Sequence, residues 1–256
     1  MVNPMRIYPL QSRWASCGLL LAAAGTIRLA AFAEEVVVAN QGAEPVPLVE
    51  AVPQMFTKAD DVRITCGGIL LCGEPGRQEG CNSLSIGADK AGRGSALFVR
   101  NVDFSVARGI SIGGIASGSL QLQKNSSLEW KETLEVGAKG LLSIIFEKVE
   151  IRGGSLLLDG TLEIQFHTPD SIRNLVKAER PLMVLSGNLQ LSGNATVRIK
   201  LVSGAAAAPL PAGEYFLISG KSLPGDLPQI ELAGEEHGQQ ISLKTTPDGL
   251  FLVVNS

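Results

Sequence analysis

Aromatic residues are scarce in this chain: two Trp, two Tyr and eight Phe make up 5% of its 256 residues. Leu, Ile, Val and Ala dominate the hydrophobic 45%, so we expect an aliphatic interior in which rings would fit poorly. Beyond residue 33, Trp130 and Tyr215 are the only Trp and Tyr. This scarcity argues against a carbohydrate groove built on aromatic platforms.

Basic clusters are also lacking. Charged residues make up 18% of the chain, below the ~25% of an average globular domain. Binding nucleic acid requires clustered Lys and Arg side chains that neutralise phosphates. Without such a cluster, we expect no nucleic acid among the partners.

Long apolar runs are absent apart from one near the N-terminus. The eleven residues Cys17 to Ile27 follow Arg6 and Arg13 and precede the small-x-small sequence Ala31 to Ala33. This order is typical of an export signal, so we expect residues 1–33 to be removed by cleavage between Ala33 and Glu34, with a cut near Ala24 as the alternative. The run is too short to span ~30 Å of hydrocarbon, so no membrane span is expected in the mature chain.

Cleavage at that position determines the expected location and charge. Removing three of the 22 basic residues leaves 19 against 25 acidic ones, a formal charge of −6. The mature chain is predicted to be secreted, on the cell surface or in the periplasm.

Three cysteines remain after the predicted cut: Cys66, Cys72 and Cys81, all within sixteen residues. In an oxidising compartment, one disulfide plus one leftover thiol is the simplest outcome. Reduced thiols and a metal site are the alternatives, although zinc sites normally pair cysteines at C-x2-C spacing, which is absent here. No metal or cofactor is expected.

Short alternating segments recur from about Ser83 onward. Runs such as "GSLQLQ", "GSLLLDGTLEI" and "GNLQLSGNATVRIKLV" place apolar side chains at every second position, between Gly, Asn, Asp or Ser. Alternation of this kind is typical of strands with one buried face. Gly118 and Gly140 are twenty-two residues apart, about one coil of a β-solenoid.

The sequence therefore predicts an all-β fold, a parallel β-solenoid with a C-terminal cap. The alternative is an antiparallel β-sandwich, because Asp159-Gly160 and Asp248-Gly249 also fit two-residue hairpins. Residues 34–60 are expected to form a linker or extended arm, 61–82 a cysteine-containing N-terminal cap, 83–204 the stacked coils and 205–256 the capping strands. Residues 168–180 are expected to form either one or two helical turns or a loop.

The stretch from Gly154 to Val254 resembles the C-terminal part of bacterial autotransporter-type β-helix passengers and related surface repeat proteins. The resemblance rests on the order of "GGSLLLDGTLEI", "LSGNLQLSGNATVRI", "AGEYFLIS" and the closing "ISLKTTPDGLFLVV". It implies a secreted or surface-displayed right-handed parallel β-helix. Autotransporters carry a C-terminal membrane barrel, for which the sequence up to Ser256 leaves no room, so a barrel-less relative or a fragment is expected.

Candidate chemical motifs are weak. Ser111 stands in a G-x-S-x-G pattern, with His167 or His237 as a conceivable base, but a nucleophile elbow needs a helix after the strand. "SGKS" (219–222) lacks the first glycine of a phosphate loop, and "GEEHG" (234–238) is typical of a solvated loop.

Glu147 and Glu163 are plausible outward-facing carboxylates, but the sequence does not show which acidic residues converge. No catalytic residue is therefore expected. The sequence favours a non-catalytic structural or adhesive module at the bacterial cell surface or in the periplasm, with a cell-surface protein or a polysaccharide as conceivable partner. The alternative is a carbohydrate-active β-helix enzyme, a polysaccharide lyase or hydrolase.

Overall fold

The computed structural model describes residues 5–9, 35–39, 49–50, 56–73, 77–87, 94–145, 148–166, 180–202, 210–223, 225–233 and 240–255. These residues form strands, turns and bends, and no helix occurs among them. The prediction of an all-β chain is confirmed. The described segments include no helix that is long and apolar enough to cross a membrane.

The strands belong to two sheets, of thirteen and eight strands. The first sheet contains, in spatial order, β1 (Met5–Pro9), β2 (Glu35–Ala39), β4 (Asp61–Thr65), β7 (Ser83–Ile86), β10 (Ile110–Ile112), β12 (Ser127–Val136), β14 (Glu150–Leu158), β16 (Met183–Leu191), β18 (Gly213–Ser222), β21 (Gly249–Asn255) and β20 (Gln240–Thr246). It also contains β6 (Arg77–Cys81) and β9 (Val102–Val106), which lie off this path.

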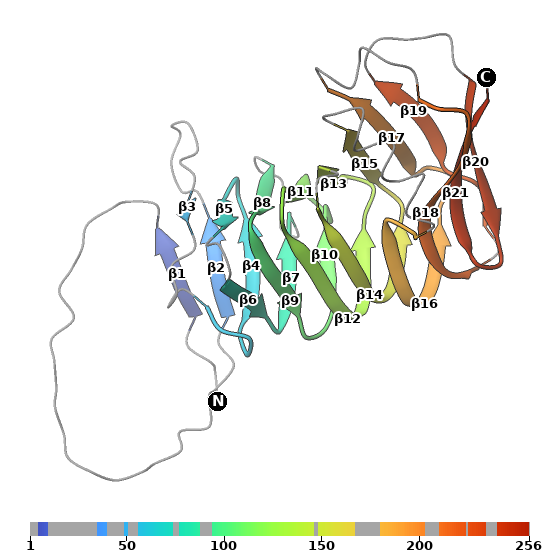
Figure 1. The fold of residues 1–256 in the computed structure, drawn as a ribbon. Coiled ribbons are helices and arrows are strands. Elements are labelled where there is room, and N and C mark those ends of the chain that lie inside the picture. Colours follow the sequence, from blue (N-terminus) through green and yellow to red (C-terminus); the bar gives the residue numbers. More distant parts are fainter. Residues whose placement is uncertain are drawn as a thin grey trace, which may run out of the picture.

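The second sheet contains, in spatial order, β19 (Gln229–Ala233), β17 (Thr196–Leu201), β15 (Thr161–Phe166), β13 (Gly140–Ile145), β11 (Gly118–Leu122), β8 (Ser95–Val99), β5 (Ile69–Cys72) and β3 (Val49–Glu50). All of its strand pairs are parallel. The chain passes repeatedly from one sheet to the other, and the strands follow one another along one axis from the blue end to the red end (Figure 1).

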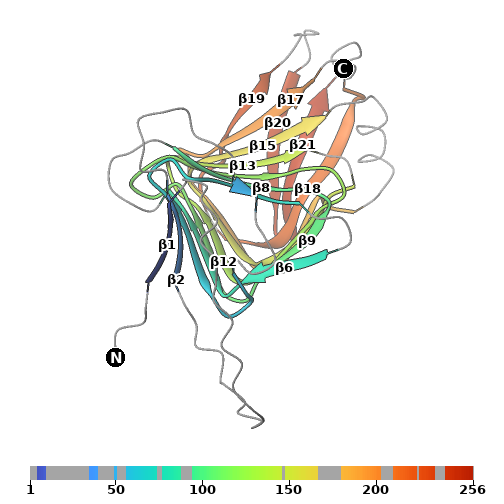
Figure 2. The same ribbon diagram turned by 90° about the vertical axis from the view of Figure 1, so that its left-hand side faces the viewer.

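The parallel register aligns the apolar positions of successive strands. In the second sheet, one column of paired residues comprises Val49, Leu70, Leu97, Leu120, Leu142, Leu162, Val197 and Ile230. Six of these eight, from Leu70 to Val197, are at most 1% exposed. Gly118 and Gly140 are register partners, as their spacing predicted. In the view along the stack, the strands of the two sheets lie on different sides of one interior (Figure 2).

Antiparallel pairing is confined, in the described part of the chain, to β18, β21 and β20. Asp248 lies in the turn between β20 and β21, so the predicted closing hairpin is confirmed there. Asp159-Gly160 does not form a hairpin: β14 and β15, on either side of it, belong to different sheets. The antiparallel sandwich considered from the sequence is therefore wrong for residues 83–202.

Residues 61–82, expected to form a cysteine-containing N-terminal cap, contribute β4, β5 and β6 to the same two sheets. The interior also accepts rings, contrary to our expectation: the largest fully buried side chains are Trp130, Tyr215, Phe104 and Phe166.

Candidate functional site

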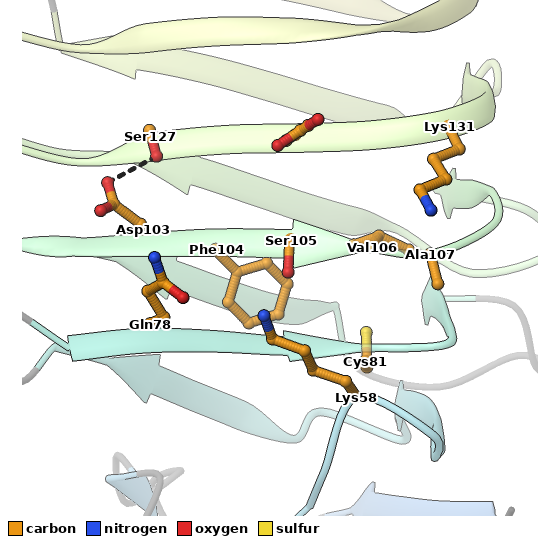
Figure 3. Close-up of a pocket in the computed structure, with 11 residues that line it drawn as sticks. Lys58, Gln78, Cys81, Asp103, Phe104, Ser105, Val106, Ala107, Ser127 and Lys131 are labelled. Atoms are coloured by element: carbon orange, nitrogen blue, oxygen red, sulfur yellow. Dashed lines mark hydrogen bonds between the residues drawn. The ribbon is translucent and has the colours of Figure 1, made fainter.

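A cavity of about 360 Å³ lies on the outer surface of β6, β9 and the first half of β12. We call these three strand segments, residues 77–81, 102–106 and 127–130, the ledge. β9 is the central strand of the ledge and pairs in parallel with both neighbours. Apolar side chains such as Phe104 and Val106 point inward from β9, so the alternate residues Asp103 and Ser105 face the cavity (Figure 3).

Register fixes the outward residues of the ledge in two rows that cross the strands. One row consists of Gln78, Asp103 and Ser127, and the Ser127 hydroxyl donates a hydrogen bond of 2.7 Å to the Asp103 carboxylate. The second row consists of Gly80, Ser105 and Glu129. Both carboxylates, Asp103 and Glu129, are exposed and line the same cavity.

Two lysines complete the cavity. Lys58 comes from the turn before β4 and extends across β6 toward Ser105, whereas Lys131 extends from β12 toward Ala107 (Figure 3). Both side chains are exposed, and neither has an ion pair or a hydrogen bond within the described residues. The cavity thus combines two cations, two carboxylates, hydroxyls and an amide.

The three predicted disulfide candidates, Cys66, Cys72 and Cys81, are not joined by a disulfide in the described part of the structure. Cys66 is exposed, whereas Cys72 and Cys81 are buried. Burial, and then the charges of Asp61 and Asp60, raise the pKa of the Cys81 thiol. Cys81 therefore stays a neutral thiol at physiological pH and is a poor nucleophile, although it lines the cavity.

The weak sequence motifs do not form reactive sites. Ser111 lies in the middle of β10, paired with Ser85 and Glu135 on the neighbouring strands, with no helix after it. Residues 219–222 lie within β18 rather than in a phosphate loop. The cleavage pair Ala33 and Glu34, together with His167, His237, Glu147 and most of residues 168–180, lies outside the described residues.

Glu163, expected to face outward, is only 7% exposed. Its carboxylate accepts hydrogen bonds from Ser143 (3.1 Å) and Gln165 (2.6 Å) and lies 3.6 Å from Arg198. Arg198 also donates a 2.8 Å hydrogen bond to Glu231, and this bond, with the charges of Glu231 and Glu163, raises the pKa of Arg198. These paired charges stabilise the outer face of the second sheet. The Glu163 carboxylate is already held by Ser143, Gln165 and Arg198, so it is not available to react with a substrate.

The described residues contain no group of three or more His, Cys, Asp or Glu side chains positioned to hold a metal ion. No family model, curated protein or solved structure matches this chain.

Sequence reasoning missed most residues of the cavity. No motif or run in the sequence identifies Lys58, Asp103, Glu129 or Lys131 as parts of one site. The one signal in the sequence is the similar separation of outward residues that pair on neighbouring strands: Gln78, Asp103 and Ser127 are separated by 25 and 24 residues.

Proposed function

We propose that this chain is an exported right-handed parallel β-helix that serves as a non-catalytic structural or adhesive module at the bacterial cell surface or in the periplasm. The observation that carries this proposal is the set of in-register apolar columns, because the inner residues of each strand align with those of strands about one coil away. Parallel strands joined by crossovers are nearly always connected right-handedly. A stack with an apolar interior and polar side chains outside is suited to present binding surfaces rather than to reorganise around a reaction.

The export part of the proposal rests on the sequence alone, on the signal-like residues 1–33. The autotransporter-type resemblance of residues 154–254 points to the same location.

Expression of the full chain in a bacterial host tests the proposal. We expect the protein in the periplasm or on the surface, with a mass that corresponds to cleavage between Ala33 and Glu34, and we expect no products when it is incubated with polysaccharides. Recovery of an uncleaved cytoplasmic protein would contradict the location, and release of oligosaccharides would contradict the non-catalytic role.

Polysaccharide cleavage is the second candidate function, because Asp103 and Glu129 line one cavity together with two lysines. Their Cα positions differ by one strand and two residues, a separation on the scale of paired catalytic carboxylates, about 5–10 Å. It ranks second because both carboxylates are exposed, whereas a general acid needs a protected environment. If polymer is cleaved, Asp103→Asn and Glu129→Gln should each abolish product release.

A further inference from the structure

Small residues lie at the centre of the cavity on the ledge. Ser105, on β9, and Ala107, directly after this strand, form its low surface. Next to them, a Cβ atom on Gly80 would lie 2.3 Å from the backbone oxygen of Ser105 and 2.5 Å from its hydroxyl, so no larger residue fits at that position without movement. Longer side chains surround this centre, namely Lys58, Gln78, Asp103, Glu129 and Lys131.

The ammonium groups of Lys58 and Lys131 are the groups most available to a ligand. They approach the outward residues of β9 from opposite sides, Lys58 across β6 and Lys131 from β12 (Figure 3), and neither is neutralised by a carboxylate in the described part of the chain. Partly enclosed cations attract an anionic group more strongly than fully solvated ones. An anion over Ser105 and Ala107 would lie between the ends of the two lysines and close to the serine hydroxyl.

The other end of the cavity is suited to hydroxyl groups. Asp103 accepts a hydrogen bond from Ser127 and retains further acceptor capacity. Gln78 lies on β6 and is the register partner of Asp103 on β9, and its side-chain amide can both donate and accept hydrogen bonds. A ligand that fits both ends carries a negative charge and several hydroxyls on one small unit.

The row that contains Ser105 and Glu129 continues to Arg152 on β14, whose guanidinium forms an exposed ion pair of 3.1 Å with Glu150. Adjacent strands are about 4.8 Å apart, comparable to the length of one sugar unit in an extended chain. The ledge can therefore contact successive units of a polymer that runs across the strands.

We infer that the ledge binds an extended acidic polysaccharide, with the carboxylate or sulfate of one sugar unit between Lys58 and Lys131 and its hydroxyls on Asp103, Ser127 and Gln78. This inference rests on the proposed adhesive role and names its ligand class. An acidic peptide is disfavoured, because Ala107 is the only outward-facing apolar side chain of the cavity and apolar side-chain pockets are what give peptides their affinity and specificity. The lack of aromatic platforms is no obstacle, since a charged sugar is held by cations and hydrogen bonds.

Binding to polygalacturonate, dextran sulfate, neutral dextran and poly-glutamate, measured by isothermal titration calorimetry on the chain purified after full-length expression, tests the inference. We expect binding to at least one of the two acidic polysaccharides, weakening as salt rises, and none to dextran. Lys58→Ala/Lys131→Ala should weaken it about tenfold or more. The matched control is Lys221→Ala, which changes an exposed lysine of β18 that has no partner within the described residues.

Three results would overturn the inference: no binding to either acidic polysaccharide, equal binding by the double lysine variant, or binding to poly-glutamate as tight as to the polysaccharides. Circular dichroism of each variant checks its folding, and Lys58→Gln/Lys131→Gln, which keeps the side-chain length, should bind as weakly as the alanine pair. Export is read separately from the mature mass. Binding by an uncleaved protein would thus support the ligand assignment while contradicting the exported role.

Discussion

Trp130 occupies the interior because the neighbouring strand, β14, has no side chain at the paired position. Trp130 pairs with Gly153, and a Cβ atom on that glycine would lie 2.1 Å from Cε2 of the indole. The indole nitrogen donates a 3.0 Å hydrogen bond to the backbone oxygen of Ser155, which fixes the ring. The glycine and the tryptophan are thus one packing unit.

Gly153→Ala should lower the free energy of unfolding by about 1–3 kcal/mol, because the indole must move within a packed interior. The measurement is urea denaturation followed by Trp fluorescence. Gly94→Ala is the matched control, since its Cβ would come no closer than 3.4 Å to a neighbour. Equal midpoints for the two variants would contradict the packing.

The three described cysteines differ in accessibility, which alkylation measures. On a chain that begins at Glu34, iodoacetamide should add one adduct under native conditions, at Cys66, because Cys72 and Cys81 are buried. In denaturant without reductant all three should react. A single adduct in both conditions would instead support the disulfide predicted from the sequence.

Tyr215 makes stability depend on alkaline pH. The side chain is 2% exposed and its hydroxyl donates to the backbone oxygen of Pro211, and burial raises the pKa of this tyrosine from 10.0 to about 12. The unfolded chain loses the phenol proton near pH 10 while the folded chain retains it. The contribution is therefore complete below pH 10 and is lost as pH rises toward 12.

We expect urea midpoints to fall between pH 10 and 12 and to fall less in Tyr215→Phe, which has no ionisable phenol. The two proteins should keep a constant difference below pH 9, where only the lost hydrogen bond separates them. Parallel midpoint curves up to pH 12 would rule out this role for Tyr215.

At the scale of strands, local alternation was a sufficient guide. Apolar residues at every second position predicted β11, β15 and β17, and the spacing of Gly118 and Gly140 predicted their pairing. The residues of the turns were not sufficient to predict how the strands pair, because Asp159-Gly160 and Asp248-Gly249 both fit a two-residue hairpin. Only the second joins antiparallel neighbours, since the strand after Asp159 pairs with β13 and β17 instead.

The ledge could not be predicted for a related reason. Its rows depend on which residues pair on neighbouring strands, and the number of residues between partners varies: Leu142 and Leu162 are separated by 20 residues, whereas Leu162 and Val197 are separated by 35. Segments between strands can lengthen without disturbing the apolar columns. The sequence pattern therefore identifies inward and outward faces but not which outward residues meet.

Glu163, Arg198 and Glu231 form a charged row across three strands of the second sheet, and this row gives a prediction at the scale of strands. Arg198→Ala leaves the nearly buried Glu163 without its cation and next to the charge of Glu231. Breaking an ion pair whose carboxylate is buried costs several kcal/mol, and here we expect about 1–3 because Arg198 is partly exposed. The exposed Lys244–Glu214 pair is the control, and Lys244→Ala should cost about 0.5 kcal/mol or less. Equal urea midpoints would show that the row contributes no more than a surface pair.

Over the whole molecule, the aligned columns pack each parallel strand on its neighbours in the sheet, so the strands at the sheet ends need protection. At the C-terminal end the chain reverses direction: β21 pairs antiparallel with β18, and β20 pairs with β21. Leu250, Leu252 and Val254 bury the inner face of β21. The hairpin thus covers a strand edge that would otherwise be open to another chain.

Leu252→Asp places a charge where the side chain is 1% exposed, between Tyr215 on β18 and Leu243 on β20. It should detach the hairpin, lower the free energy of unfolding by about 2–5 kcal/mol and expose the edge of β18. Sedimentation velocity should then show self-association through that edge, together with a lower urea midpoint. Ser242→Asp puts the same charge on the exposed face of the same hairpin and should leave the protein monodisperse. If Leu252→Asp gave the same urea midpoint and the same monodisperse sedimentation as Ser242→Asp, the hairpin would not contribute to stability. The apolar columns would then have to be stable without an end cap.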